Sequence, residues 1–132
     1  MPRKLPALTP DTAPFWQGGA QGELLIHHCT GCQRFFHPPA PVCPRCGSLD
    51  VAPRAVSGRA RVLTFTVNHQ AWSSELTQPY VVAIVGLDEQ DDLRLLTNIV
   101  GCNPAQVAIG MPVRVTFEPQ EDVWIPLFER AA

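Results

Sequence analysis

Two short cysteine pairs constrain this chain more than any other feature of its sequence. Cys29 and Cys32 form one C-x-x-C pair, Cys43 and Cys46 form a second, and ten residues lie between the pairs. A two-residue gap lets two thiolates of one turn bind the same ion, and two such turns supply the four sulfur ligands of a tetrahedral zinc site. The sequence therefore predicts one zinc ion per chain, bound by these four cysteines.

The residues around the pairs indicate a closed, structural site. Pro44 fixes φ within the second turn, and Gly47 can adopt the left-handed conformation that turns backbone N–H groups toward the sulfur atoms. Four thiolates leave no open coordination position, so the zinc is expected to be structural and not catalytic. His27, His28 and His37 flank the pairs and are expected to surround the site without binding the ion. The alternatives are iron at the same cysteines, which would make the chain an electron carrier, and a metal-free redox dithiol.

The N-terminal residues, the apolar runs, the cysteines and the net charge indicate the cellular compartment and the possible partners of the protein. The first residues carry two basic side chains followed by prolines, which is not the pattern of a secretion signal, and no run of ~18 apolar residues predicts a membrane span. Paired thiolates suit a reducing compartment, so we expect a cytoplasmic protein. A net charge of -2 argues against nucleic acid and anionic membranes as partners.

We expect three units along the chain: an N-terminal helical segment (1–23), a zinc ribbon (24–53) and a barrel (54–132). The strands expected in the barrel are residues 63–68, 80–87, 93–100, 113–118 and 123–128. A connector at 101–110 can hold a helical turn. The predicted fold class is mostly β: a short helix, a rubredoxin-like zinc ribbon and a five-stranded OB-fold Greek-key barrel.

Several local features carry more detailed predictions. Thr9 and Pro10 predict the start of the short helix, whose two aromatic residues must pack on another part of the chain or on a partner protein. Leu63 is expected to face the core, because it begins a period-two alternation of apolar side chains. The acidic residues of 88–92 are expected to form a solvated turn. Pro126 is expected at an edge or a strand end, because it cannot donate a ladder hydrogen bond.

The order and spacing of the motifs resemble one family, the bacterial and archaeal acyl-CoA-associated proteins that join a rubredoxin-like zinc ribbon to an OB fold. The matching stretches are residues 15–16, 22–25, 38–39, 43–47, 57–58, 64–69, 79–83, 109–113 and 125–128. The resemblance covers nearly the whole chain. Three departures are Gln33, where a glycine often follows the first cysteine pair, Ala40, where a basic residue often follows the prolines, and the expected loop 70–78, which lacks a proline-plus-phenylalanine element common there.

The resemblance implies a function. Members of this family are non-catalytic accessory subunits of thiolase-like enzymes, including thiolases, acyltransferases and the retro-aldolases of sterol side-chain breakdown. By this likeness the chain is expected to stabilise such an enzyme, with a hydratase as a further partner, and to help hold a CoA thioester that the two proteins share. The alternative is an OB-fold protein that binds single-stranded nucleic acid.

The residues themselves suggest no catalytic centre. Cys102 and His69 are the one conceivable Cys/His pair outside the zinc site, and a lone cysteine at a strand end is expected to be a small apolar residue. The candidate contacts to CoA or to a partner are Phe15, Trp16, Arg59, Arg61 and Trp72. Guanidinium groups recognise phosphate, and Trp72 lies in the loop between the first two barrel strands, through which OB folds commonly bind.

Overall fold

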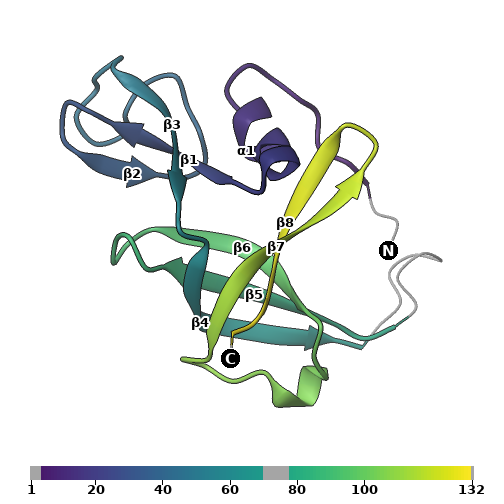
Figure 1. Cartoon of the computed structure of the whole chain (residues 1–132). Coiled ribbons are helices and arrows are strands. Elements are labelled where there is room, and N and C mark those ends of the chain that lie inside the picture. Colours follow the sequence, from purple (N-terminus) through teal and green to yellow (C-terminus); the bar gives the residue numbers. More distant parts are fainter. Residues whose placement is uncertain (1–3, 70–77, 132) are drawn as a thin grey trace.

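The computed structural model describes residues 4–69 and 78–131. Its helical elements are α1 (Ala13–Gln17) and the 3₁₀ turns η1 (Gly18–Gln21) and η2 (Pro104–Gln106). Its strands are β1 (Leu24–Cys29), β2 (Arg34–Phe36), β3 (Val51–Val56), β4 (Arg59–Asn68), β5 (Tyr80–Leu87), β6 (Arg94–Val100), β7 (Pro112–Gln120) and β8 (Val123–Arg130). The predicted class, mostly β with a short helix, a zinc ribbon and an OB-fold barrel, is confirmed (Figure 1).

The ribbon is a three-stranded sheet with the order β2-β1-β3. β1 is its central strand, antiparallel to both neighbours, and pairs with β3 from Leu24 opposite Val56 to Cys29 opposite Val51. The predicted boundary between residues 53 and 54 falls inside β3. In Figure 1 this sheet lies above the barrel, and β3 leads down into β4. The ribbon and barrel are therefore joined by a short connection between two consecutive strands.

The barrel closes in the order β4-β5-β6-β8-β7. The prediction that Leu63 faces the core is wrong, because the β4–β5 register shifts between Val62 and Thr64. Such a bulge reverses the side-chain alternation on one strand. Val62 is buried, whereas Leu63 is 40% exposed and covers Gly86 on the outer face. Composition and alternation alone could not place the bulge.

Closure depends on a short parallel pairing between β6 and β8, in which Ile99 lies opposite Phe128. Phe128 also lies opposite Val115 of β7 and is fully buried, so its ring fills the barrel where three strands meet. Pro126 lies two residues before this closure, where β8 still pairs with β7 but its pairing with β6 has not begun. Pro126 therefore lies at an edge, which is one of the two predicted positions, and it does not end the strand, because β8 runs on to Arg130.

α1 begins later than predicted. The expected start at Thr9 and Pro10 is wrong: Thr12 is the N-cap, and the Thr9 carbonyl accepts a hydrogen bond from Ala13 N–H (2.8 Å) in a turn that precedes the helix. η1 then brings Gly19 against the β7–β8 hairpin, where a Cβ would lie 2.5 Å from Cβ of Trp124. A side chain at this position would separate the helix from the hairpin.

The aromatic pair of α1 packs within the chain. Phe15 is only 8% exposed and belongs to the main core, and Trp16 is partly buried between this core and a smaller cluster of Val123, Ile125 and Leu127. This is the first of the two alternatives that the sequence left open. No helix in the described part of the chain is long and apolar enough to cross a lipid bilayer.

Candidate functional site

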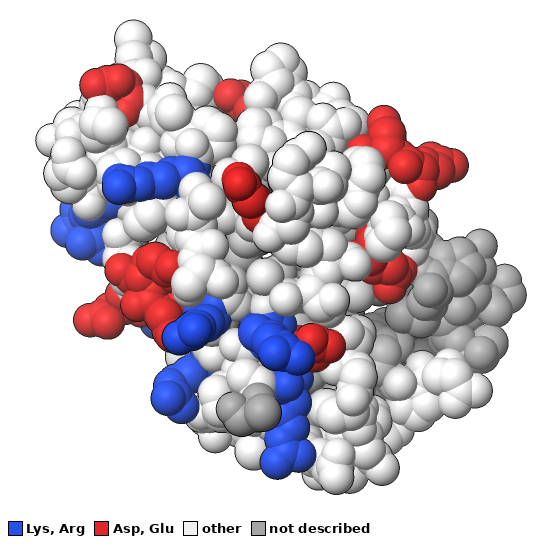
Figure 2. Space-filling model, in the orientation of Figure 1, with Lys and Arg blue, Asp and Glu red and all other residues white. Residues whose placement is uncertain are grey.

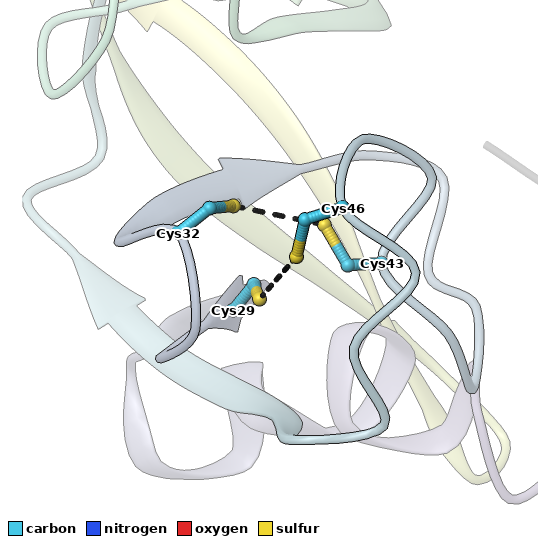
Figure 3. A group of neighbouring side chains, drawn as sticks. All are labelled: Cys29, Cys32, Cys43 and Cys46. Carbon is cyan, nitrogen blue, oxygen red and sulfur yellow. Dashed lines mark hydrogen bonds between the residues drawn. The ribbon is translucent and has the colours of Figure 1, made fainter.

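The four cysteines of the two pairs converge on one point (Figure 3). Sγ of Cys29 lies 3.6 Å from Sγ of Cys46, Sγ of Cys32 lies 3.8 Å from Sγ of Cys43, and all four sulfur atoms lie within 4.8 Å of one another. In a zinc tetrahedron with ~2.3 Å bonds, neighbouring sulfur atoms are about 3.8 Å apart. A disulfide would require about 2.05 Å. The geometry therefore fits a four-coordinate zinc ion and excludes disulfides.

The backbone of the second pair supports a thiolate, as the turn residues predicted. Gly47 has φ of +76°, and its N–H donates to the Cys43 carbonyl (2.9 Å). Hydrogen bonds from the backbone N–H groups of Cys46 and Arg45 to the sulfur lower the pKa of Cys43 to about 6. Such donors stabilise the charged form of a ligand and orient it toward the metal.

The remaining thiols require a cation to ionise together. Burial, followed by hydrogen bonds with the neighbouring sulfur atoms, raises the pKa of Cys32 to about 12, and repulsion from the charge of Cys29 adds to the effect. A divalent cation reverses this repulsion and displaces the protons. Four soft thiolates at tetrahedral spacing suit zinc, and the ribbon carries a structural zinc site.

The three nearby histidines contact aromatic rings and lie outside the sulfur cluster. His27 lies against Phe36 with ring centroids 5.7 Å apart, and His28 lies 4.8 Å from Phe35. His37 lies 4.8 Å from the ring of Phe15, which links the ribbon to α1. Burial lowers the pKa of His37 to about 4, and the charge of His27 adds to this effect. His37 is therefore neutral at pH 7 and serves as packing material.

We expect the burial of His37 to make stability fall below pH 6.5. As the pH falls, the unfolded chain, with its ordinary histidine pKa near 6.5, binds the proton at a higher pH than the folded chain does. The free energy of unfolding therefore decreases from pH 6.5 down to about pH 4. Between pH 7.5 and pH 5 this amounts to about 2 kcal/mol. Urea unfolding of the zinc-loaded chain should show a shallower pH dependence in His37→Phe than in the wild type. The exposed His69, changed to Asn, is the control; identical pH profiles for all three proteins would contradict the expectation.

The prediction of a solvated turn between β5 and β6 is incomplete, because side chains of this turn also form hydrogen bonds that join the ribbon to the barrel. The side-chain amide of Gln90 pairs with both backbone groups of Phe35 in β2: Oε1 accepts from Phe35 N–H (3.0 Å), and Nε2 donates to the Phe35 carbonyl (2.9 Å). Nε2 also donates to the Asp92 carboxylate (2.8 Å). The Gln90 side chain thus makes the two hydrogen bonds to the free edge of β2 that a neighbouring strand would otherwise make.

Two further contacts come from the same turn. The Asp92 carboxylate pairs with Arg34 (2.7 Å) and lies 4.0 Å from Arg45, which stands inside the second cysteine pair. The Gln90 amide and the Arg34 guanidinium hold the pKa of Asp92 below its usual range. Glu89 accepts a hydrogen bond from Ser57 N–H (2.6 Å) in the connection between β3 and β4. We call these contacts of Glu89, Gln90 and Asp92 the latch. The sequence did not predict the latch, because its partner residues lie some 30 to 60 positions away in the chain.

Replacing Gln90 with leucine should loosen the ribbon on the barrel. The change keeps the side chain's size but removes both hydrogen bonds to Phe35, which is expected to lower the free energy of unfolding by about 1–3 kcal/mol. Hydrogen exchange should show faster exchange of the Phe35 amide. Gln106→Leu, at an exposed position of η2, is the matched control and should change neither quantity. Unchanged protection of Phe35 in Gln90→Leu would show that the latch is not needed.

The other predicted site residues are dispersed. Arg59 and Arg61 are exposed at the start of β4, beside β7. Phe15 is buried inside the chain, which leaves Trp16 as the more accessible residue of that pair. Trp72 lies outside the described residues.

Comparisons with known proteins agree with this architecture. The model of the ChsH2 rubredoxin-like zinc ribbon domain matches residues 16–52, and that of the ChsH2 C-terminal OB-fold domain matches residues 53–118. A solved chain described as "Ltp2-ChsH2(DUF35) aldolase" superposes with a TM-score of 0.86 at 36% identity, over 97% of this chain and 100% of that one.

Curated relatives carry two kinds of name. A "3-oxo-4,17-pregnadiene-20-carboxyl-CoA hydratase alpha subunit" of Mycobacterium tuberculosis is 40% identical over 85% of this chain and 35% of its own length. A "DUF35 domain-containing scaffold protein" of Methanocaldococcus jannaschii is 35% identical over 71% of this chain and 67% of its own length. The chain spans only 35% to 40% of the hydratase subunits that it matches.

Proposed function

Because this chain belongs to the ChsH2 family, in which a rubredoxin-like zinc ribbon is joined to an OB-fold domain, we propose that it is a non-catalytic scaffold subunit of a thiolase-like enzyme acting on acyl-CoA. The observation that carries the proposal is the match to the entire ChsH2(DUF35) chain that is described together with the Ltp2 aldolase. The partner we propose is an aldolase subunit of this kind, with an acyl-CoA hydratase as a second component and a steroid or other lipid as the acyl group. Thiolases and acyltransferases are the other partner types of this class.

The arrangement of reactive side chains supports a non-catalytic role. Four of the five cysteines are committed to zinc, and Cys102 is partly buried against the barrel core. His69 is exposed beyond the end of β4, in a hollow whose lining does not include Cys102. Among the residues that the structure describes, Cys102 and His69 are therefore not joined as a nucleophile and its base.

The outer face of β4, β5 and β6 supplies an apolar surface for the partner. Leu63 and Leu96 are exposed, and Leu96 lies opposite the half-buried Ile84 in the sheet. A shallow hollow of about 210 Å³ opens between Leu96, Ile84 and Phe65. Contiguous exposed apolar surface is typical of interaction sites. We propose that this face docks on the aldolase subunit, while Trp16 and Trp72 supply further contacts to the partner or its CoA thioester.

Co-expression with an Ltp2-type aldolase tests the proposal. The two proteins should copurify, and the aldolase should be more soluble with this chain than without it. Failure to copurify, with no effect on the aldolase's solubility or activity, would reject the proposed function.

Changing Leu96 to aspartate should weaken this complex by roughly tenfold or more, because a charge buried in an apolar interface loses its hydration without a partner. Leu49→Asp is the matched control: Leu49 is 78% exposed and Leu96 73%, but Leu49 lies in the ribbon, away from the β4–β6 face. Copurification yields and the dissociation constant from surface binding measure the effect. Equal binding by both variants would place the docking surface elsewhere.

A further inference from the structure

An open groove of about 890 Å³ runs along the beginning of β4 and β7, with Gly22 at one side. Three arginines line it: Arg59 and Arg61 of β4 and Arg114 of β7. Figure 2 shows several positively charged side chains close together over this lower part of the barrel, with acidic side chains beside them, although the whole chain has a net charge of -2. The concentration of charge is therefore local and does not follow from the composition.

The register of the barrel places two of these charges face to face. Arg59 of β4 lies directly opposite Arg114 of β7, and Arg114 lies opposite Glu129 of β8. Like charges directly opposite on neighbouring strands destabilise a sheet. Glu129 binds only one of the two, through the Nε of Arg114 (3.0 Å). Of these three facing residues, Arg59 therefore has a positive charge that the Glu129 carboxylate does not compensate.

Arg61 adds a third guanidinium on the same outer face, two residues further along β4. Its Nη1 donates to the Gly110 carbonyl (3.1 Å), which fixes the side chain beside the groove. Within residues 4–69 and 78–131, no carboxylate lies at ion-pair distance from Arg59 or Arg61. Asp88 is the one acidic residue of the described lining, against three arginines. The described lining of the groove thus carries an excess of positive charge.

We propose that this groove binds clustered phosphate groups, namely those at the nucleotide end of a CoA thioester. This assignment rests on the proposed function, which supplies CoA as the ligand. Guanidinium groups bind phosphate through paired hydrogen bonds, and a ligand with several phosphates would neutralise the facing arginines together. The volume is within the range of small-molecule sites. The groove adds Arg114 to the two arginines that the sequence suggested.

Titration of the zinc-loaded chain with adenosine 3′,5′-bisphosphate, followed by NMR at low ionic strength, tests the groove. Resonances along the start of β4 and β7 should shift. Arg59→Gln and Arg61→Gln should each raise the dissociation constant roughly tenfold, because each removes charge-assisted hydrogen bonds. Arg54→Gln, at an exposed arginine of β3, is the matched control and should leave the affinity unchanged. Added salt should weaken binding in the wild type.

The outcomes separate this inference from the proposed function. Affinity that is the same in all variants, or no binding by the wild type, would overturn the groove assignment; copurification with the aldolase would be unaffected. If inorganic pyrophosphate bound as tightly as the bisphosphate, the choice of CoA would be overturned in favour of a general phosphate site. If an oligothymidylate bound much more tightly than the bisphosphate, the groove would be a nucleic-acid site. If the chain does not copurify with the aldolase but binds the bisphosphate through Arg59 and Arg61, the scaffold function fails and the groove stands.

Discussion

Removing zinc from this chain is expected to unfold the ribbon and leave the barrel folded. The reason is that the ribbon outside β1 has almost no core of its own: from residue 30 to residue 50, Cys43 is the one residue buried as deeply as the barrel core, and His37 is partly buried. Zinc binding in comparable peptides provides about 10–16 kcal/mol of apparent free energy, far more than the latch at Gln90 can replace. The barrel has its own closed set of strands around Phe128 and should persist.

Chelation followed by two-dimensional NMR measures this effect residue by residue. Signals of β1, β2 and the second cysteine pair should collapse toward random-coil positions, and those of β5 and β7 should remain dispersed. Cys43→Ser should behave like the chelated protein, with less than one zinc per chain by elemental analysis. Cys102→Ser is the control and should keep one zinc. A ribbon that stays folded without the ion would refute its structural role.

Truncating Phe128 to alanine is expected to remove about 3–5 kcal/mol of the free energy of unfolding. Its side chain is fully buried where β6, β7 and β8 meet, so the substitution leaves a cavity at the barrel's closure. For a domain of this size the loss is a large part of total stability, and part of the population is expected to unfold at 37 °C. Urea unfolding of the zinc-loaded chain gives the value directly.

Two further variants calibrate the Phe128 result. Phe128→Leu keeps most of the buried volume and should cost less than half as much. Ile109→Ala, at a side chain that is 71% exposed, should be nearly neutral. If Phe128→Ala cost no more than Ile109→Ala, the barrel would not be closed by this ring.

The sequence predicted those features that depend on short-range patterns. The four cysteines were identifiable because each pair spans one turn, and the barrel strands because alternation and apolar runs are local. The helical turn in the connector, η2, is present at Pro104–Gln106 as expected. Gln33 has a φ of +60°, which lies in the left-handed region that favours glycine.

The features that escaped prediction depend on contacts between distant residues. The side chain of Gln90 imitates a strand for Phe35, which lies 55 residues away, and an isolated glutamine in an acidic turn carries no mark of that role. Arg59 and Arg114 face each other only because β4 and β7 pair in one register. The bulge after Val62 likewise depends on the partner strand. Each requires the three-dimensional pairing before its consequence can be seen.

The account is tested most directly by reconstituting an Ltp2-type aldolase and measuring acyl-CoA cleavage with three additions: buffer, the zinc-loaded chain and the chain after chelation. We predict that the zinc-loaded chain raises the aldolase's activity or lifetime, that the chelated chain does so much less, and that the chain alone cleaves no thioester. Turnover by the isolated chain, or equal aldolase activity in all three mixtures, would contradict the view that this protein is a zinc-organised scaffold without catalysis of its own.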